Sequence, residues 1–173
     1  MRTKKEMRRL ADALIASLPA PVPDDPEALF AALVAAVGQW RGREVTLHRE
    51  VFPPHTASGL WLNREAHDHI VVDRRAAVWH QIVIFCHEVW HMHRVPHPAP
   101  GDAPAALRTD FSLADEQEAD RFGMLMGQRL RTLMERETET GGGDGPGPDG
   151  DADGSGGIAG RIGAALNYRG NRA

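Results

Sequence analysis

The sequence predicts an α+β fold, with helices packed on a small, mostly antiparallel sheet of about three strands. Two observations lead to this prediction. Apolar residues recur at helical spacing in residues 3–18, in residues 26–40 and in two later segments. Between them, residues 45–73 contain three short segments with the apolar pattern of strands. The chain has 173 residues, of which 42% are hydrophobic, enough for one domain with a modest core.

Two helices are expected before the strands. Residues 3–18 carry apolar residues at helical spacing, and the proline-rich connector at 19–23 ends this helix. Asp25 can cap the second helix, and Pro26 suits its first position. The apolar face of this second helix extends to Trp40.

Three strand candidates follow, at Val45–Val51, Gly59–Leu62 and His69–Asp73, with polar or proline-containing turns between them. The segment Ala76–Arg94 is apolar and long enough for a helix, and a proline shortly after it ends the helix. A serine that can act as a cap begins the last long helix, Ser112–Glu137. The order is therefore helices, then a small sheet, then helices.

The chain divides into four expected parts. Residues 1–23 form an N-terminal helix with its connector, and residues 24–138 form the main domain. Residues 139–157 are almost all Gly, Asp and Pro, a composition typical of a disordered linker. Residues 158–173 form a tail or a short helix.

Composition excludes several classes of function. The formal net charge is −4, and Lys and Arg do not cluster enough for direct binding of nucleic acid. No apolar run approaches the roughly 18 residues of a membrane-spanning helix, so no membrane association is expected. The single cysteine, Cys86, excludes an internal disulfide framework and suits a reducing compartment. We expect a cytoplasmic protein.

The most informative motif is His87–His91, which reads His-Glu-Val-Trp-His in the most apolar predicted helix. Histidines four residues apart project from one face of a helix and can share one metal ion. Glu88 lies beside that face, where a carboxylate can take a proton from water at the metal. A catalytic zinc site needs three protein ligands and one open position. His87 and His91 are therefore candidate ligands of one Zn²⁺ ion, and Glu88 is the candidate general base.

The third ligand must come from elsewhere, and three residues compete for the role. Glu116 is favoured, because it shares a helix face with Asp120, which can orient a ligating histidine through a hydrogen bond. Glu118 points to another side of that helix and is expected to be exposed. His97 completes a three-histidine spacing, but Arg94 stands where that pattern has a turn-forming glycine.

Two glycines continue the helix face that carries Glu116. Gly123 and Gly127 lie one and two turns after Asp120. Their lack of side chains allows this helix to approach the helix of His87 closely, as a shared metal ion requires.

Over roughly residues 25–135, the sequence resembles the ImmA/IrrE family of metallopeptidases. The resemblance depends on the order of elements, on the His-Glu-x-x-His motif at 87–91, and on a second motif. Glu116–Phe122 reads Glu-x-Glu-Ala-Asp-x-Phe, similar to the Glu-x-x-Ala-Asn/Asp-x-Phe-Ala signature of the family. Two departures are Trp90, where relatives usually have Gly or Ala, and Gly123, where they usually have Ala.

The resemblance implies a zincin-like fold and a gluzincin-like site, in which His87, His91 and Glu116 bind one Zn²⁺ ion and Glu88 activates water. It also implies an endopeptidase that acts on a protein partner. Family members are often paired with a helix-turn-helix transcriptional repressor, and some belong to toxin–antitoxin-like gene pairs. The alternative, motivated by Trp90, is a non-catalytic metal-binding regulatory protein or toxin component that sequesters its partner.

Overall fold

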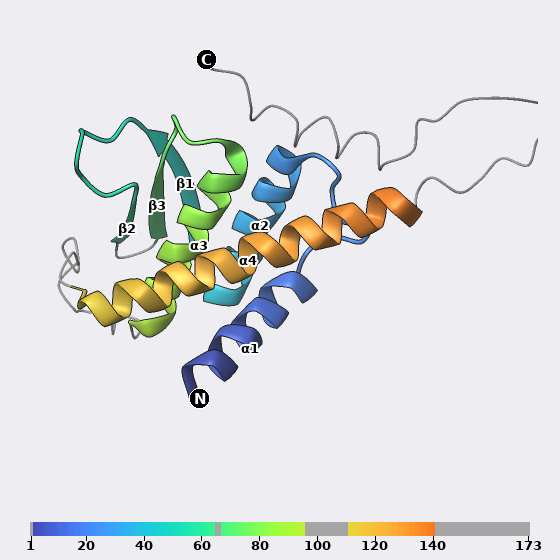
Figure 1. Cartoon of the computed structure of the whole chain (residues 1–173), viewed down its shortest axis with the longest axis horizontal. Helices are drawn as coiled ribbons and strands as arrows, with labels where there is room; N and C mark the ends of the chain where they lie inside the picture. The colour runs from blue at the N-terminus through green and yellow to red at the C-terminus, as the bar shows by residue number, and fades with distance from the viewer. Residues whose placement is uncertain (1, 65–66, 96–110, 141–173) are drawn as a thin grey trace, which may run out of the picture. The chain divides into compact units, whose positions relative to one another are not determined.

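Four helices pack on a three-stranded sheet in the computed structural model of the chain (Figure 1), which describes residues 2–64, 67–95 and 111–140. The predicted α+β class and the predicted number of strands are confirmed. Along two of the three strands, buried residues alternate with half-buried or exposed ones, as expected where one face of the sheet carries the helices.

Helix α1 (Arg2–Ala16) and helix α2 (Pro26–Arg41) occupy the two segments predicted from apolar spacing and proline placement. Asp25 caps α2, because its Oδ2 atom accepts the backbone N–H of Ala28 at 2.8 Å. Gly42 ends α2 with φ of 70°, in the left-handed region that favours glycine.

The sheet contains β1 (Glu44–Glu50), β2 (Gly59–Asn63) and β3 (His67–Asp73) in the order β1-β3-β2. Strand β2 pairs with β3 antiparallel, whereas β1 pairs with β3 parallel. The sheet is therefore mixed, where the sequence predicted a mostly antiparallel one. The difference arises because β3 inserts between β1 and β2: the chain reverses along β2 and then returns in the direction of β1.

Helix α3 (Val78–Arg94) lies between the sheet and helix α4 (Leu113–Thr140) and contacts both. Ser112 caps α4 as predicted. Its Oγ atom accepts the N–H of Asp115 at 3.2 Å, and Asp115 Oδ2 accepts the N–H of Ser112 at 3.1 Å. In Figure 1, α4 crosses the other helices as a long rod, with its first turns nearest β2 and the end of α3.

The buried apolar side chains of all four helices and the sheet form one hydrophobic core. Helix α1 adds four buried residues to this core: Met7, Leu10, Ala11 and Leu14. It therefore belongs to the same compact unit as the residues that follow it. Helix α4 continues to Thr140, and the rest of the predicted linker at 139–157 and the predicted tail at 158–173 lie outside the described residues. No helix of the described part is long and apolar enough to cross a membrane.

A buried carboxylate connects three elements of this core. Asp68 of β3 is fully buried and accepts hydrogen bonds from Arg41 Nε at 3.1 Å and from Trp61 Nε1 at 2.9 Å. Arg43 Nε lies 3.4 Å from the same carboxylate. Arg41 also donates from Nη1 to the carbonyl oxygen of Met92 in α3 at 3.1 Å. The Asp68 network thus ties α2, β2 and β3 to the second half of α3.

Replacing this carboxylate should destabilise the fold strongly. In Asp68→Asn, the buried guanidinium of Arg41 would lose its counter-charge, and we expect the free energy of unfolding to fall by about 3–5 kcal/mol. Urea denaturation followed by circular dichroism measures this loss. Glu27→Gln is the matched control, because the Glu27–Arg49 ion pair is exposed and should contribute less than about 1 kcal/mol. Equal losses in the two variants would contradict the assignment.

Candidate metal centre

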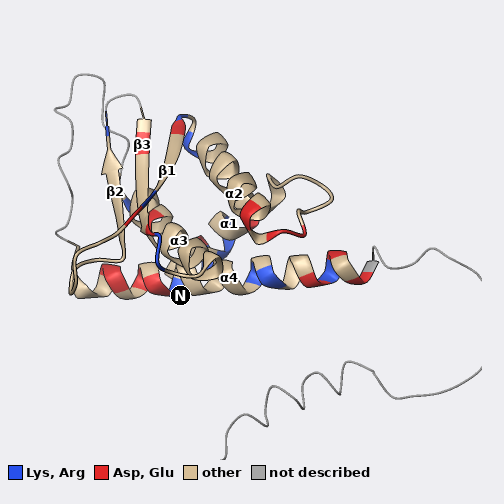
Figure 2. Ribbon diagram, turned by 90° about the horizontal axis from the view of Figure 1, so that it is seen from above, with Lys and Arg blue, Asp and Glu red and all other residues tan. Residues whose placement is uncertain are grey.

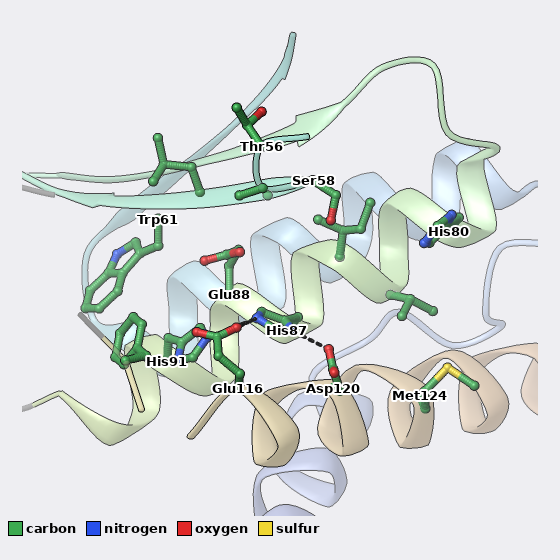
Figure 3. A pocket seen from close by; sticks show the side chains of 16 residues that line it. Thr56, Ser58, Trp61, His80, His87, Glu88, His91, Glu116, Asp120 and Met124 are labelled. Atoms are coloured by element: carbon green, nitrogen blue, oxygen red, sulfur yellow. Dashed lines mark hydrogen bonds and ion pairs between the residues drawn. The ribbon is translucent and has the colours of Figure 1, made fainter. Parts of the chain in front are cut away.

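His87 and His91 project from one face of α3, one helical turn apart, toward the first turn of α4 (Figure 3). Their Nε2 atoms are 3.0 Å apart. Glu116, in the first turn of α4, reaches both rings: its Oε2 atom is 3.2 Å from His87 Nε2, and its Oε1 atom is 3.3 Å from His91 Nε2. The structure therefore brings the three predicted ligands together, although Glu116 is 25 residues beyond His91 in the sequence.

The spacing of these donor atoms fits one shared metal ion. Tetrahedral ligands at about 2.0–2.1 Å from a zinc ion are about 3.3 Å from one another. The two imidazole nitrogens are 3.0 Å apart, and the carboxylate of Glu116 comes within 3.2 Å of one and 3.3 Å of the other through its two oxygens, distances close to that value. Within the described part of the chain, His87, His91 and Glu116 form a group that can hold a metal ion.

His87 is oriented by Asp120, one turn after Glu116 on α4. Its Nδ1 atom lies 3.0 Å from Asp120 Oδ1. Because an ionised carboxylate only accepts hydrogen bonds, Nδ1 must carry the proton, and Nε2 then presents its lone pair to the group. Asp120 was predicted to orient a ligating histidine through a hydrogen bond, and this contact is of that kind.

His91 is held in the neutral form that a metal ligand needs. Its side chain is only 2% exposed, and burial, followed by the charge of His87, lowers its pKa to about 4. The ring stacks on Phe111, with ring centroids 3.7 Å apart and an interplanar angle of 18°. Its Nδ1 atom is buried without a hydrogen-bond partner among the described residues.

Phe111 is a residue of the site that sequence reasoning did not identify. It precedes Ser112, the cap of α4, and an apolar residue just before a cap often packs against an apolar residue in the first turns of the same helix. That position was the available signal. Here the ring instead stacks on the imidazole of His91, a residue that is only 2% exposed.

Glu88 lies beside the metal-binding group, between α3 and β2 (Figure 3). Its carboxylate accepts the backbone N–H of Trp61, and a Cβ atom at Gly59 would be only 2.7 Å from its Oε1 atom. Burial, followed by the negative charge of Glu116, raises the pKa of Glu88 to about 8. The side chain of Glu88 is therefore confined, and its surroundings raise its affinity for a proton.

A cleft of about 800 Å³ opens in front of these groups. Its walls are formed by α3, the first half of α4 and the segment that leads into β2. The polar lining comprises Thr56, Ser58, His80, His87, Glu88, His91, Glu116 and Asp120. All four residues with predicted ligand or catalytic roles therefore face one open space.

Trp90, inside the His-Glu-x-x-His motif, lies outside this cleft. Its side chain is fully buried and packs on Phe122 of α4, with ring centroids 5.2 Å apart. His93 lies at the same centroid distance from Trp90. The bulky residue therefore helps join α3 to α4 in the core, away from the site.

Glu118, one of the other two candidates for the third ligand, is not among the residues of this group. Glu118 was expected to be exposed, but it is half-buried, and its Oε2 atom has no hydrogen-bond partner among the described residues. The prediction of an exposed side chain was wrong, because α4 is partly covered on more than one face. His97 lies outside the described residues.

The two glycines of α4 permit the approach of the metal-binding helices. A Cβ atom at Gly123 would be 2.7 Å from the backbone oxygen of Val83 and 3.5 Å from the backbone nitrogen of His87. At Gly127 it would be 2.8 Å from Val83 Cγ2. The predicted close contact between the two helices is confirmed.

Comparisons with protein-family models, with curated proteins and with solved structures found no match for this chain. A functional assignment therefore depends on the geometry and the chemistry of the site itself.

Adding a methyl group at Gly123 should separate the helices. Val83 O is part of the backbone and cannot rotate away, so Gly123→Ala should lower stability by about 1–3 kcal/mol and weaken zinc binding. Gly38→Ala in α2 is the matched control: both variants gain the same helix propensity, but a Cβ atom at Gly38 would be no closer than 3.4 Å to a neighbouring atom. Zinc titration and thermal unfolding compare the two variants, and equal effects would contradict the steric explanation.

Removing the orienting carboxylate should weaken metal binding without unfolding the protein. We expect Asp120→Ala to lower zinc affinity about 10- to 100-fold, because the His87 ring loses its fixed tautomer and orientation. Competition with a chromophoric chelator measures the affinity. Gln117→Ala, at an exposed position of the same helix, should leave it unchanged. An unaltered affinity in Asp120→Ala would exclude the orienting role.

Proposed function

We propose that this protein is a zinc-dependent metallo-endopeptidase that acts on a protein partner. The observation that carries the proposal is the position of Glu88, a confined carboxylate beside three convergent donors at the wall of an open cleft. Three protein donors leave one coordination position for water or substrate, as in catalytic zinc sites. Two imidazoles and a carboxylate match the preference of zinc for N and O ligands.

The residues of the site divide the chemistry among them. A bound Zn²⁺ ion would polarise the carbonyl of the scissile peptide bond and lower the pKa of a water molecule. Glu88 would accept a proton from that water and deliver it to the departing amine. Burial and, after it, the negative charge of Glu116 raise the pKa of Glu88; a divalent cation would offset the second cause and so favour the ionised form that acts as a base.

The edge of the sheet offers a place for an extended peptide. Strand β2 is at the edge of the sheet, and Gly59, Leu60 and Trp61 line the cleft. Edge strands bind extended peptides through main-chain hydrogen bonds. A peptide laid along β2 would pass in front of Glu88, which already accepts the N–H of Trp61.

For the partner, we propose a helix-turn-helix transcriptional repressor, or the other component of a toxin–antitoxin pair, encoded near this protein. The support is the resemblance of the two motifs to the ImmA/IrrE family, together with the meeting of those motifs at one site. Such a partner would place the reaction in the cytoplasm.

Replacing the proposed base should separate metal binding from catalysis. We expect zinc-loaded protein to cleave the product of the neighbouring regulator gene, and Glu88→Gln to lower the rate about 10²–10⁴-fold while retaining zinc. His87→Ala should lose both zinc and activity. Gel-based cleavage assays and elemental analysis provide the two measurements.

The same variants distinguish catalysis from sequestration. If the partner binds but stays intact, and binding survives Glu88→Gln but fails in His87→Ala, the metal has a structural role and the peptidase proposal is wrong. Cleavage that is unaffected by Glu88→Gln would instead show that Glu88 is not the base.

A further inference from the structure

A second pair of histidines meets on the sheet face opposite the helices. His48 of β1 and His69 of β3 belong to the strand pair with parallel register, in which Thr46 is opposite His69. Because side chains alternate between faces, His48 and His69 lie on the same face, diagonally across the pair. The fully buried neighbours of His69, Asp68 and Ile70, point to the other face, into the core.

The two imidazoles are in direct contact through ring nitrogens. His48 Nε2 lies 3.0 Å from His69 Nδ1, and the ring centroids are 5.1 Å apart. Nitrogens so close must share a proton or a metal ion, because two protonated rings would repel each other. The same separation joins His87 Nε2 and His91 Nε2 at the first site.

The surroundings favour the neutral imidazole that binds metals. Burial, followed by the charges of His48 and His67, lowers the pKa of His69. Both rings are half-buried in the sheet surface, and Leu62 of β2 is directly opposite His69. The pair is therefore positioned by the strands on both sides of it.

We propose that His48 Nε2 and His69 Nδ1 form a second metal site, which binds one divalent transition-metal ion such as Zn²⁺, Ni²⁺ or Cu²⁺. Imidazole nitrogens select these borderline ions over Mg²⁺ and Ca²⁺, which prefer oxygen ligands. Water would complete the coordination. The site has two protein donors, so it binds more weakly than the three-donor site, and a bound ion cross-links β1 to β3.

His67 provides an internal control. It lies on the same face, but its ring centroid is 6.1 Å from that of His69 and its Nδ1 atom is 3.8 Å from Glu44 Oε2. His67 is on β3, two residues before His69, but the proposed site does not include it as a ligand. Its removal should leave the second site intact.

Zinc titration of the metal-free protein, purified without a histidine tag, tests the proposal by calorimetry. We expect two ions per chain, the second bound at least tenfold more weakly than the first. His48→Gln and His69→Gln should each bind one ion, whereas His67→Gln should bind two. The double variant His87→Ala/His91→Ala should keep only the weaker ion, so failure of the first site and failure of the second are distinguishable.

Nuclear magnetic resonance of the wild-type protein gives a measurement that needs no substitution. Zinc should shift the ¹⁵N resonances of His48 Nε2 and His69 Nδ1 together, at the stoichiometry of the weaker ion. A single ion per chain in the wild type, or a second ion that persists in both His48→Gln and His69→Gln, would overturn the proposal. Resonances that respond to pH but not to zinc would show that the pair shares only a proton.

Discussion

Gly123 of α4 lies against the backbone of α3, where an added Cβ atom would be 2.7 Å from the carbonyl oxygen of Val83. This close approach sets the position of everything that α4 presents to the cleft. One turn before Gly123, Asp120 reaches His87, and one turn earlier still Glu116 reaches both histidines. Helices separated by ordinary side chains have axes about 8–10 Å apart, and a side chain at Gly123 would hold the carboxylates away from the imidazoles.

Three carboxylates and two imidazoles meet in the cleft, where a proton or a divalent cation would offset the negative charge. Figure 2 shows acidic residues gathered in the first turns of α4. There the carboxylates of Glu116 and Asp120 meet two imidazoles, and burial favours the neutral form of one of them, His91. Glu88 adds a third carboxylate, and its raised pKa reflects the cost of ionising it in that setting. Either a proton or a divalent cation would relieve this cost, so a metal ion bound here would lower the pKa of Glu88.

The Asp68 network and the candidate metal centre meet at Trp61. The indole of Trp61 donates to Asp68, while its backbone N–H donates to Glu88. Neither contact was predicted from the sequence, because Asp68 resembles an ordinary polar residue at the start of a strand. The partners of its carboxylate come from α2 and β2, brought near only by folding. The placement of Trp90 in the core rather than in the cleft is a similar case.

The sequence by itself determined the helices, the caps of α2 and α4, the approximate strand positions and the pairing of His87 with His91, because each depends on residues a few positions apart along the chain. It also favoured Glu116 as the third donor, through the face that Glu116 shares with Asp120. Only the tertiary structure decided which carboxylate reaches the histidines, where Phe111 packs, and that β1 runs parallel to β3. These outcomes depend on which helix and strand faces pack together when residues far apart in the sequence meet. The spacing of apolar residues shows which face of an element is buried, but not which other element covers it.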